Sequence, residues 1–208
     1  MPSQAHYLRQ GIGLIGYGTA TFANAITSAH EIYGMFDRNM PEASLESWAL
    51  TASTALGSIF EASNRYFTSK RDAPDMVPVP IPPSIDPHGI LENLKKGGFI
   101  YGEENEVYYY RVHETTLSGT KRYEIYIPKD TALMKEPKSV ETVNPQIFRV
   151  GDIVEAQVSF IVVPLKDKKY KMIVMLRSIA LLDTTFSQAR TIKLCTCTYS
   201  YSCTHRKQ

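Results

Sequence analysis

The sequence predicts an α+β fold: an N-terminal helical hairpin, followed by a small antiparallel β-barrel or curled sheet, of which an OB-like barrel is one form. Apolar residues recur at helical spacing between residues 18 and 67. Six of the chain's twelve prolines fall between residues 74 and 87. From residue 107 onward, aromatic and β-branched residues alternate with polar ones, as they do in strands. The expected organisation is a helical hairpin over 1–67, a Pro-rich linker over 68–87, a β-rich domain over 88–185 and a basic, Cys-containing tail over 186–208.

Two amphipathic helices are expected in the first part. The first covers residues 19–36, where apolar residues follow one helical face. The second begins at Asn39, a candidate N-cap with Glu42 placed for a capping box, and its apolar stripe runs from Leu45 to Phe67. The short connection between them predicts an antiparallel hairpin. Two such helices cannot bury both apolar faces alone, so we expect them to pack on the rest of the chain, on a protein partner or on a second copy.

The prolines of residues 74–87 exclude a regular helix or a central strand there. They favour an extended, semi-rigid spacer. A Pro-rich ligand for an SH3-like domain is the alternative interpretation. Directly after this segment, Asp86 is placed to cap a short helix through Leu94, which Gly97 and Gly98 would end.

The second half of the chain has the pattern of a small β domain. Turns are expected at residues 117–120 and at the charged run 166–169, and a long, Pro-interrupted connection at 128–149. Four or five antiparallel strands with one helix favour a barrel or a curled sheet, because closure or covering removes exposed strand edges. The predicted strands cover residues 107–113, 123–127, 153–162 and 170–182.

Four segments of this region resemble a known but uncharacterised domain. They are Asp86–Leu91, Glu103–Val107, Gly151–Glu155 and Leu176–Asp183. Together they are similar to an uncharacterised β-rich domain found in predicted proteins of mushroom-forming fungi, over about residues 86–183. The resemblance implies a domain in this part of the chain, and it brings no activity, cofactor or catalytic residue.

Charge and cysteine usage limit the function classes. The net charge is +2, and the segment 186–208 holds four basic residues and no acidic one, so the rest of the chain is close to neutral. A strongly basic nucleic-acid footprint is therefore missing at the level of composition. All three cysteines lie in the same tail, which excludes a disulfide framework in the folded body and favours an intracellular protein. No segment has the unbroken apolarity of a membrane span, so no membrane contact is expected.

The N-terminal segment contains the letters G-x-G-x-x-G at Gly11, Gly13 and Gly16. A dinucleotide site needs a buried strand before the first glycine and a helix from the last, within a βαβ unit, and neither that strand nor a second unit is predicted. The preferred interpretation is a flexible or closely packed lead-in to the first helix. The A-x-A pattern at residues 23–25 leaves a cleaved signal peptide open as an alternative.

Catalytic and metal sites have weak sequence support. His113 beside Glu114 lacks the neighbours of an acid/base site, and no nucleophile elbow or H-E-x-x-H motif is present, so no enzyme and no resident cofactor is predicted. The tail carries ligands of the type and number that zinc requires, so a zinc site there competes with a redox-labile tail without metal. These ligands are Cys195, Cys197, Cys203 and His205.

The predicted function is non-enzymatic binding or assembly through protein–protein contacts, by a partner or a homo-oligomer at the helical region. The alternative is single-stranded nucleic-acid binding by the β domain, in which tyrosines stack on bases and basic residues frame them. The candidate residues for this alternative are Tyr108, Tyr110, Lys121, Arg122, Lys166, Lys168, Lys169 and Lys171.

Overall fold

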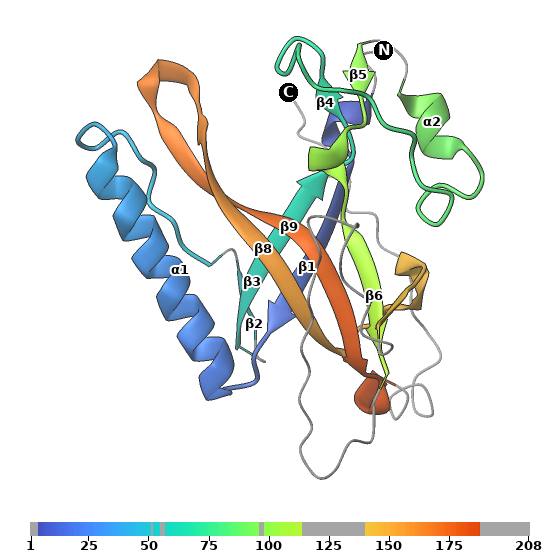
Figure 1. The fold of residues 1–208 in the computed structure, drawn as a ribbon. Coiled ribbons are helices and arrows are strands. Elements are labelled where there is room, and N and C mark those ends of the chain that lie inside the picture. Colours follow the sequence, from blue (N-terminus) through green and yellow to red (C-terminus); the bar gives the residue numbers. More distant parts are fainter. Residues whose placement is uncertain (1–3, 51, 55–56, 96–97, 114–139, 188–208) are drawn as a thin grey trace, which may run out of the picture.

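The computed structural model describes residues 4–50, 52–54, 57–95, 98–113 and 140–187, and it confirms the α+β class (Figure 1). Its α-helices are α1 (Ala20–Asn39) and α2 (Ile90–Leu94), and short 3-10 turns cover Gln4–Tyr7, Glu103–Asn105, Pro145–Ile147 and Lys166–Lys168. The strands are β1 (Arg9–Ile15), β2 (Ala52–Thr54), β3 (Gly57–Arg65), β4 (Thr68–Ser69), β5 (Phe99–Ile100), β6 (Tyr108–Val112), β7 (Val140–Thr142), β8 (Ile153–Pro164) and β9 (Tyr170–Asp183).

The strands form three open sheets within the described residues. Their orders are β1-β3-β2, β4-β5 and β7-β6-β9-β8, so no closed barrel is formed by this part of the chain. The described residues therefore form curled or open sheets, and they do not form the closed barrel that was the other form of the prediction. The largest sheet is also not purely antiparallel, because β6 runs parallel to β9.

The predicted helical hairpin is wrong, because only its first helix forms. α1 matches the expectation for residues 19–36, but the chain leaves the helix after Asn39. The backbone on either side of Leu45 then pairs with Tyr170. The Tyr170 N–H donates to the Ser44 carbonyl and the Glu46 N–H donates to the Tyr170 carbonyl, each at an N···O distance of 2.8 Å. The region predicted as the second helix continues as β2 and β3, and Gly57, which begins β3, has a φ of 120°, outside the helical range.

The alternation along β3 explains why a strand forms where a helix was expected. Phe60, Ala62 and Asn64 are all buried, at a period of two residues. β3 pairs antiparallel with β1 on one side and with β2 on the other. β1 pairs with Ile59–Arg65, and β2 pairs with Gly57–Ile59, so backbone groups along the whole of β3 have partners in a neighbouring strand.

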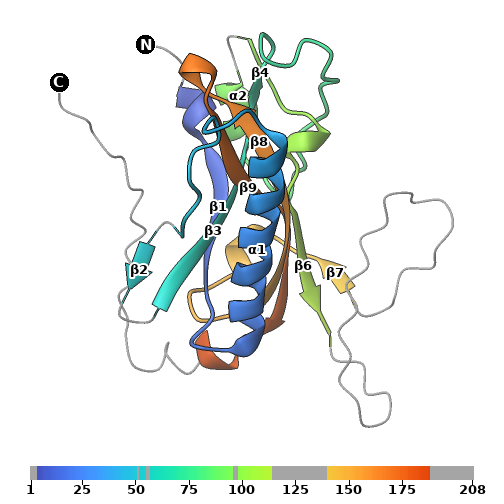
Figure 2. The same ribbon diagram turned by 90° about the vertical axis from the view of Figure 1, so that its left-hand side faces the viewer.

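The main core joins the two larger sheets and α1. Ala29 of α1 and Phe60 of β3 belong to the same buried cluster as Val174 and Leu176 of β9. Trp48 lies between helix and sheet, with its ring centroid 4.8 Å from His30 and 6.3 Å from Phe60. Figure 2 shows α1 lying in front of the long β8–β9 hairpin. The apolar face of α1 is thus used within the chain itself.

A second, smaller core lies under the Pro-rich segment. Phe67 and Tyr101 are fully buried there, and Val79 and Ile81 pack against them. The segment forms neither helix nor strand over residues 74–87, as predicted, but it is held to the body by the Val79 N–H, which donates to the Tyr101 carbonyl at 2.9 Å.

The predicted short helix and most predicted strands are confirmed. The carboxylate of Asp86 accepts from the backbone N–H groups of Ile90 and Glu92, at 2.7 and 2.9 Å, and so caps α2. β6, β8 and β9 match three predicted strands, and the charged turn between β8 and β9 is the 3-10 turn at Lys166–Lys168. The predicted turn at 117–120 and strand at 123–127 lie outside the described residues.

Candidate functional site

The glycine motif is part of a strand. Gln10, Ile12 and Leu14 of β1 point toward the interior at a period of two, which is the sequence signal that would have revealed this strand. Gly11 and Gly13 lie on the other face, and a Cβ added there would meet β3 side chains at 3.2 and 3.0 Å. The glycines therefore let two antiparallel strands approach closely. The sequence-based interpretation of this segment as a lead-in to the first helix did not predict the strand.

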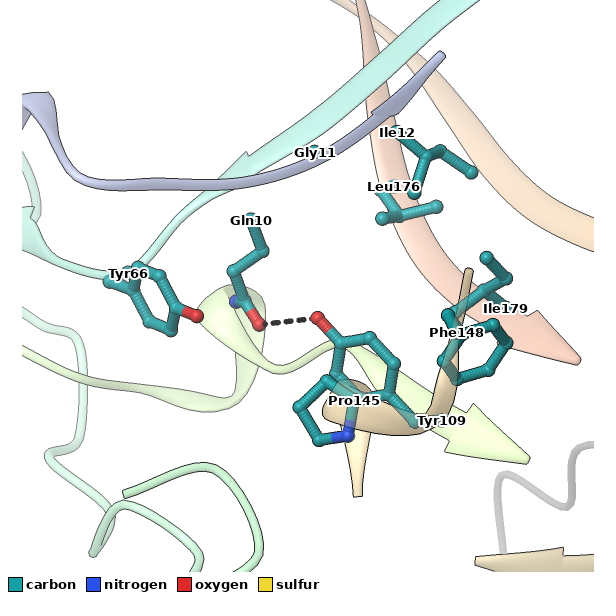
Figure 3. A pocket seen from close by; sticks show the side chains of 9 residues that line it. All are labelled: Gln10, Gly11, Ile12, Tyr66, Tyr109, Pro145, Phe148, Leu176 and Ile179. Carbon is teal, nitrogen blue, oxygen red and sulfur yellow. Dashed lines mark hydrogen bonds between the residues drawn. The ribbon is translucent and has the colours of Figure 1, made fainter. Parts of the chain in front are cut away.

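A cavity of about 290 Å³ opens where the two larger sheets meet (Figure 3). β1 and the residue after β3 supply one side, β6 and β9 the other, and the 3-10 turn after β7 closes over it. Its walls are mostly aromatic and aliphatic. The lining residues are Gln10, Gly11, Ile12, Tyr66, Tyr109, Pro145, Phe148, Leu176 and Ile179.

The polar end of this cavity is a hydrogen-bonded pair from distant parts of the chain. Gln10 is only 4% exposed, and its Nε2 donates to the Asn105 carbonyl at 2.7 Å. The Tyr109 hydroxyl donates to Gln10 Oε1 at 3.1 Å, as the dashed line in Figure 3 shows. Burial raises the pKa of Tyr109, and the nearby Tyr66 and Tyr101 act in the same direction, so the phenol stays neutral.

Asn105 anchors the other side of Gln10. Its side chain is buried, Oδ1 accepts from the Gly102 N–H at 3.0 Å, and Nδ2 donates to Thr68 Oγ1 at 3.0 Å and to the Arg65 carbonyl at 3.2 Å. Three polar groups from separate segments are thus satisfied by one carboxamide. This network fixes the backbone on which Gln10 rests.

Two of the tyrosines proposed for nucleic-acid binding form a pair on β6. The rings of Tyr108 and Tyr110 are stacked, with centroids 6.3 Å apart and planes 13° apart, and Tyr108 is 44% exposed. The Tyr108 hydroxyl donates to Glu106 Oε2 at 2.5 Å. This hydrogen bond is the main reason why the pKa of Tyr108 is raised to about 12.

The four proposed lysines that the structure describes do not lie beside that pair. Tyr108 is in register with Ser178, whereas Lys171 is in register with Val163, near the hairpin turn. Ser178 lies seven positions after Lys171 on β9, which is a distance of about 23 Å along an extended strand. The other three lysines are at the turn, where Lys169 Nζ donates to the Ala43 carbonyl at 2.9 Å. Lys121 and Arg122 lie outside the described residues.

Only some of the predicted catalytic and metal-binding candidates lie among the described residues. His113 lies 3.1 Å from Glu141 Oε2 in an exposed pair, and Glu114 is outside the described residues. The zinc candidates Cys195, Cys197, Cys203 and His205 also lie outside them, so zinc binding by the tail stays a prediction. In the part of the chain that is described, no three His, Cys, Asp or Glu side chains gather in a way that could hold a metal ion.

β8 forms one border of the largest sheet. It is 12 residues long, and no described strand pairs with its outer edge. Glu155 is its only charged residue, and its pairing with β9 is interrupted by two register shifts. Long, weakly charged edge strands are the sites at which other chains add a strand.

No protein family model, no curated protein and no solved structure matches this chain. The resemblance to a domain of mushroom-forming fungi therefore stays a prediction. Among the described helices, none combines the length and the apolar character that crossing a lipid bilayer requires.

Proposed function

We propose that this protein is a non-enzymatic binding and assembly module that acts through protein–protein contacts, with the outer edge of β8 as its docking strand. The single observation that supports this is that no strand among the described residues pairs with the outer edge of this 12-residue strand, in which only Glu155 carries a charge. The predicted docking region was a helical hairpin. That hairpin does not form, and Trp48 and Phe60, which were assigned to its second helix, belong to the main core instead.

A second copy of the chain suits this edge. In an antiparallel pairing centred on Ser159, the N-terminal end of one β8 lies next to the C-terminal end of the other. Asp152 and Glu155 are at the first end, and Lys166 and Lys168 follow the second. Opposite charges would therefore meet at both ends of the pair, while the two Glu155 side chains stay apart.

Sedimentation of the full chain over a range of concentrations tests the proposal. We expect a reversible dimer that the double substitution Gln157→Lys and Ile161→Lys abolishes, because these positions face each other across the two-fold axis and would carry like charges. The matched control is Thr142→Lys with Gln146→Lys, at exposed positions on and after β7. A monomer at every concentration, or a dimer that survives the β8 substitutions, would refute docking at this edge.

A second candidate function is single-stranded nucleic-acid binding, which the stacked and partly exposed pair Tyr108–Tyr110 favours. Fluorescence anisotropy of a labelled oligonucleotide, at low and near-physiological salt, tests it. Binding by bases stacking on β6 should weaken at least tenfold on Tyr108→Ala with Tyr110→Ala, given roughly 1–3 kcal/mol per stacked base. Tyr17→Ala, at an exposed tyrosine elsewhere, should leave it unchanged.

A further inference from the structure

The cavity between the two sheets has a polar end and an apolar end. Gln10 and the Tyr109 hydroxyl form the polar end, and Ile12, Leu176 and Ile179 stand on the apolar side (Figure 3). None of the lining side chains carries a charge at neutral pH. An ionic group placed here would lose its hydration without gaining a partner of opposite charge, so the walls select against charged ligands.

The polar end still has unused hydrogen-bonding capacity. A carboxamide offers two N–H donors and two acceptor sites, and a phenol oxygen accepts as well as donates. Gln10 gives one N–H to the Asn105 carbonyl and accepts one hydrogen bond, from Tyr109. The second N–H of Gln10 can therefore donate to a ligand, and the lone pairs of the Tyr109 oxygen can accept from one.

The size of the cavity limits the ligand to one or two rings. Cavities of about 150 Å³ lined by Leu, Ile and Phe bind benzene, and this one has about 290 Å³. The ring centroids of Tyr109 and Phe148 are 5.9 Å apart, and the two ring planes meet at an angle of 59°. The two rings therefore form two adjoining walls of the cavity. A flat ring can contact one of them face to face and the other at its edge.

We propose that this cavity is a binding site for a small, neutral aromatic molecule of one or two rings that carries a hydroxyl or a ring N–H group, the class that phenol and indole represent. The ring occupies the apolar side. Its hydroxyl or ring N–H donates to the Tyr109 oxygen, and a hydroxyl oxygen can instead accept from the second N–H of Gln10. The site is separate from the β8 edge, so its existence does not depend on the proposed assembly.

Ligand-detected NMR titrations of the full chain with phenol, indole, benzene and benzoate test this site. Phenol and indole should bind with dissociation constants on the order of 0.1–1 mM, and benzoate at least about tenfold more weakly. Ile179→Phe should fill the cavity and weaken phenol binding about tenfold or more. Ile173→Phe is the matched control, because it makes the same change on the same strand at a position that does not line the cavity.

A milder variant keeps the test decisive if Ile179→Phe does not fold. Tyr109→Phe removes one oxygen, and it should weaken phenol several-fold while benzene binding stays the same. No binding of phenol or indole up to about 10 mM, benzoate binding as tight as phenol binding, or an unchanged ratio of phenol to benzene affinity in Tyr109→Phe would each overturn the proposal.

Discussion

Replacement of Asn105 by alanine should destabilise the protein more than any surface change of equal size. The Asn105 side chain is buried and joins Gly102, Thr68 and Arg65 through three hydrogen bonds. Alanine removes all three. The bond from Gln10 ends on the backbone carbonyl of residue 105, so it survives the substitution.

The expected loss in the free energy of unfolding follows from the number of hydrogen bonds removed and from the buried polar groups that lose their partners. A hydrogen bond contributes about 0.5–1.5 kcal/mol net, so three contribute roughly 1.5–4.5 kcal/mol. The Gly102 N–H lies at a buried residue, and it loses its acceptor without gaining water. A buried donor left without a partner costs about 1–3 kcal/mol, which places the loss in the upper part of that range, at about 3–4 kcal/mol.

Urea unfolding followed by the fluorescence of Trp48, the chain's only tryptophan, measures the effect, since this ring packs against the main core. The midpoint should fall while the slope stays the same. Asn93→Ala is the control: Asn93 is exposed, and its Nδ2 donates only to the Gly89 carbonyl, so the change should stay within about 0.5 kcal/mol. A loss below about 1 kcal/mol for Asn105→Ala would show that the network does not stabilise the fold.

Three further predictions concern glycines and a tyrosine. Gly16→Ala should cost about 2–3 kcal/mol in the same unfolding assay, because the new Cβ would lie 2.1 Å from the ring of Phe22, which packs against the main core; a cost near zero would contradict this packing. Gly34→Ala, in the middle of α1, should stabilise by about 0.5–1 kcal/mol, and a clear loss of stability would exclude a helix there. The pKa of Tyr108, raised to about 12, should fall toward 10 in Glu106→Gln when phenolate absorbance is titrated. Because that pKa is raised on folding, the stabilisation is complete below pH 10 and is lost as the pH rises to about 12, and a titration unaffected by Glu106→Gln would refute the hydrogen bond as its cause.

The sequence was sufficient to predict an element where its residues followed a single periodicity. α1, the Asp86 cap and the strands β6, β8 and β9 each have a single consistent pattern. The failure at β3 arose because Phe60 fits the apolar stripe of a helix as well as the buried face of a strand, and only the pairing of β3 with β1 decides between the two.

The cavity could not be predicted from the sequence for a different reason. Gln10 and Ile179 line the same space although most of the chain lies between them, and no local pattern links them. The tyrosines of β6 were interpreted as stacking platforms for bases, and no cavity was predicted at Tyr109, which faces the other way and lines it. Alternation along β6 indicates two faces, but it does not show what stands opposite either of them.

The parallel pairing of β6 with β9 has a consequence for the order in which the chain can fold during its synthesis. Tyr108 is in register with Ser178, 70 residues later. At about 5–20 residues per second, a ribosome needs roughly 4–14 s to make that interval. Throughout this time β6 has no partner on that edge, and the hairpin that supplies it has to be complete before the centre of the sheet can form. The nascent chain therefore presents this edge of β6 without its β9 partner for several seconds, an interval in which exposed strand edges favour aggregation.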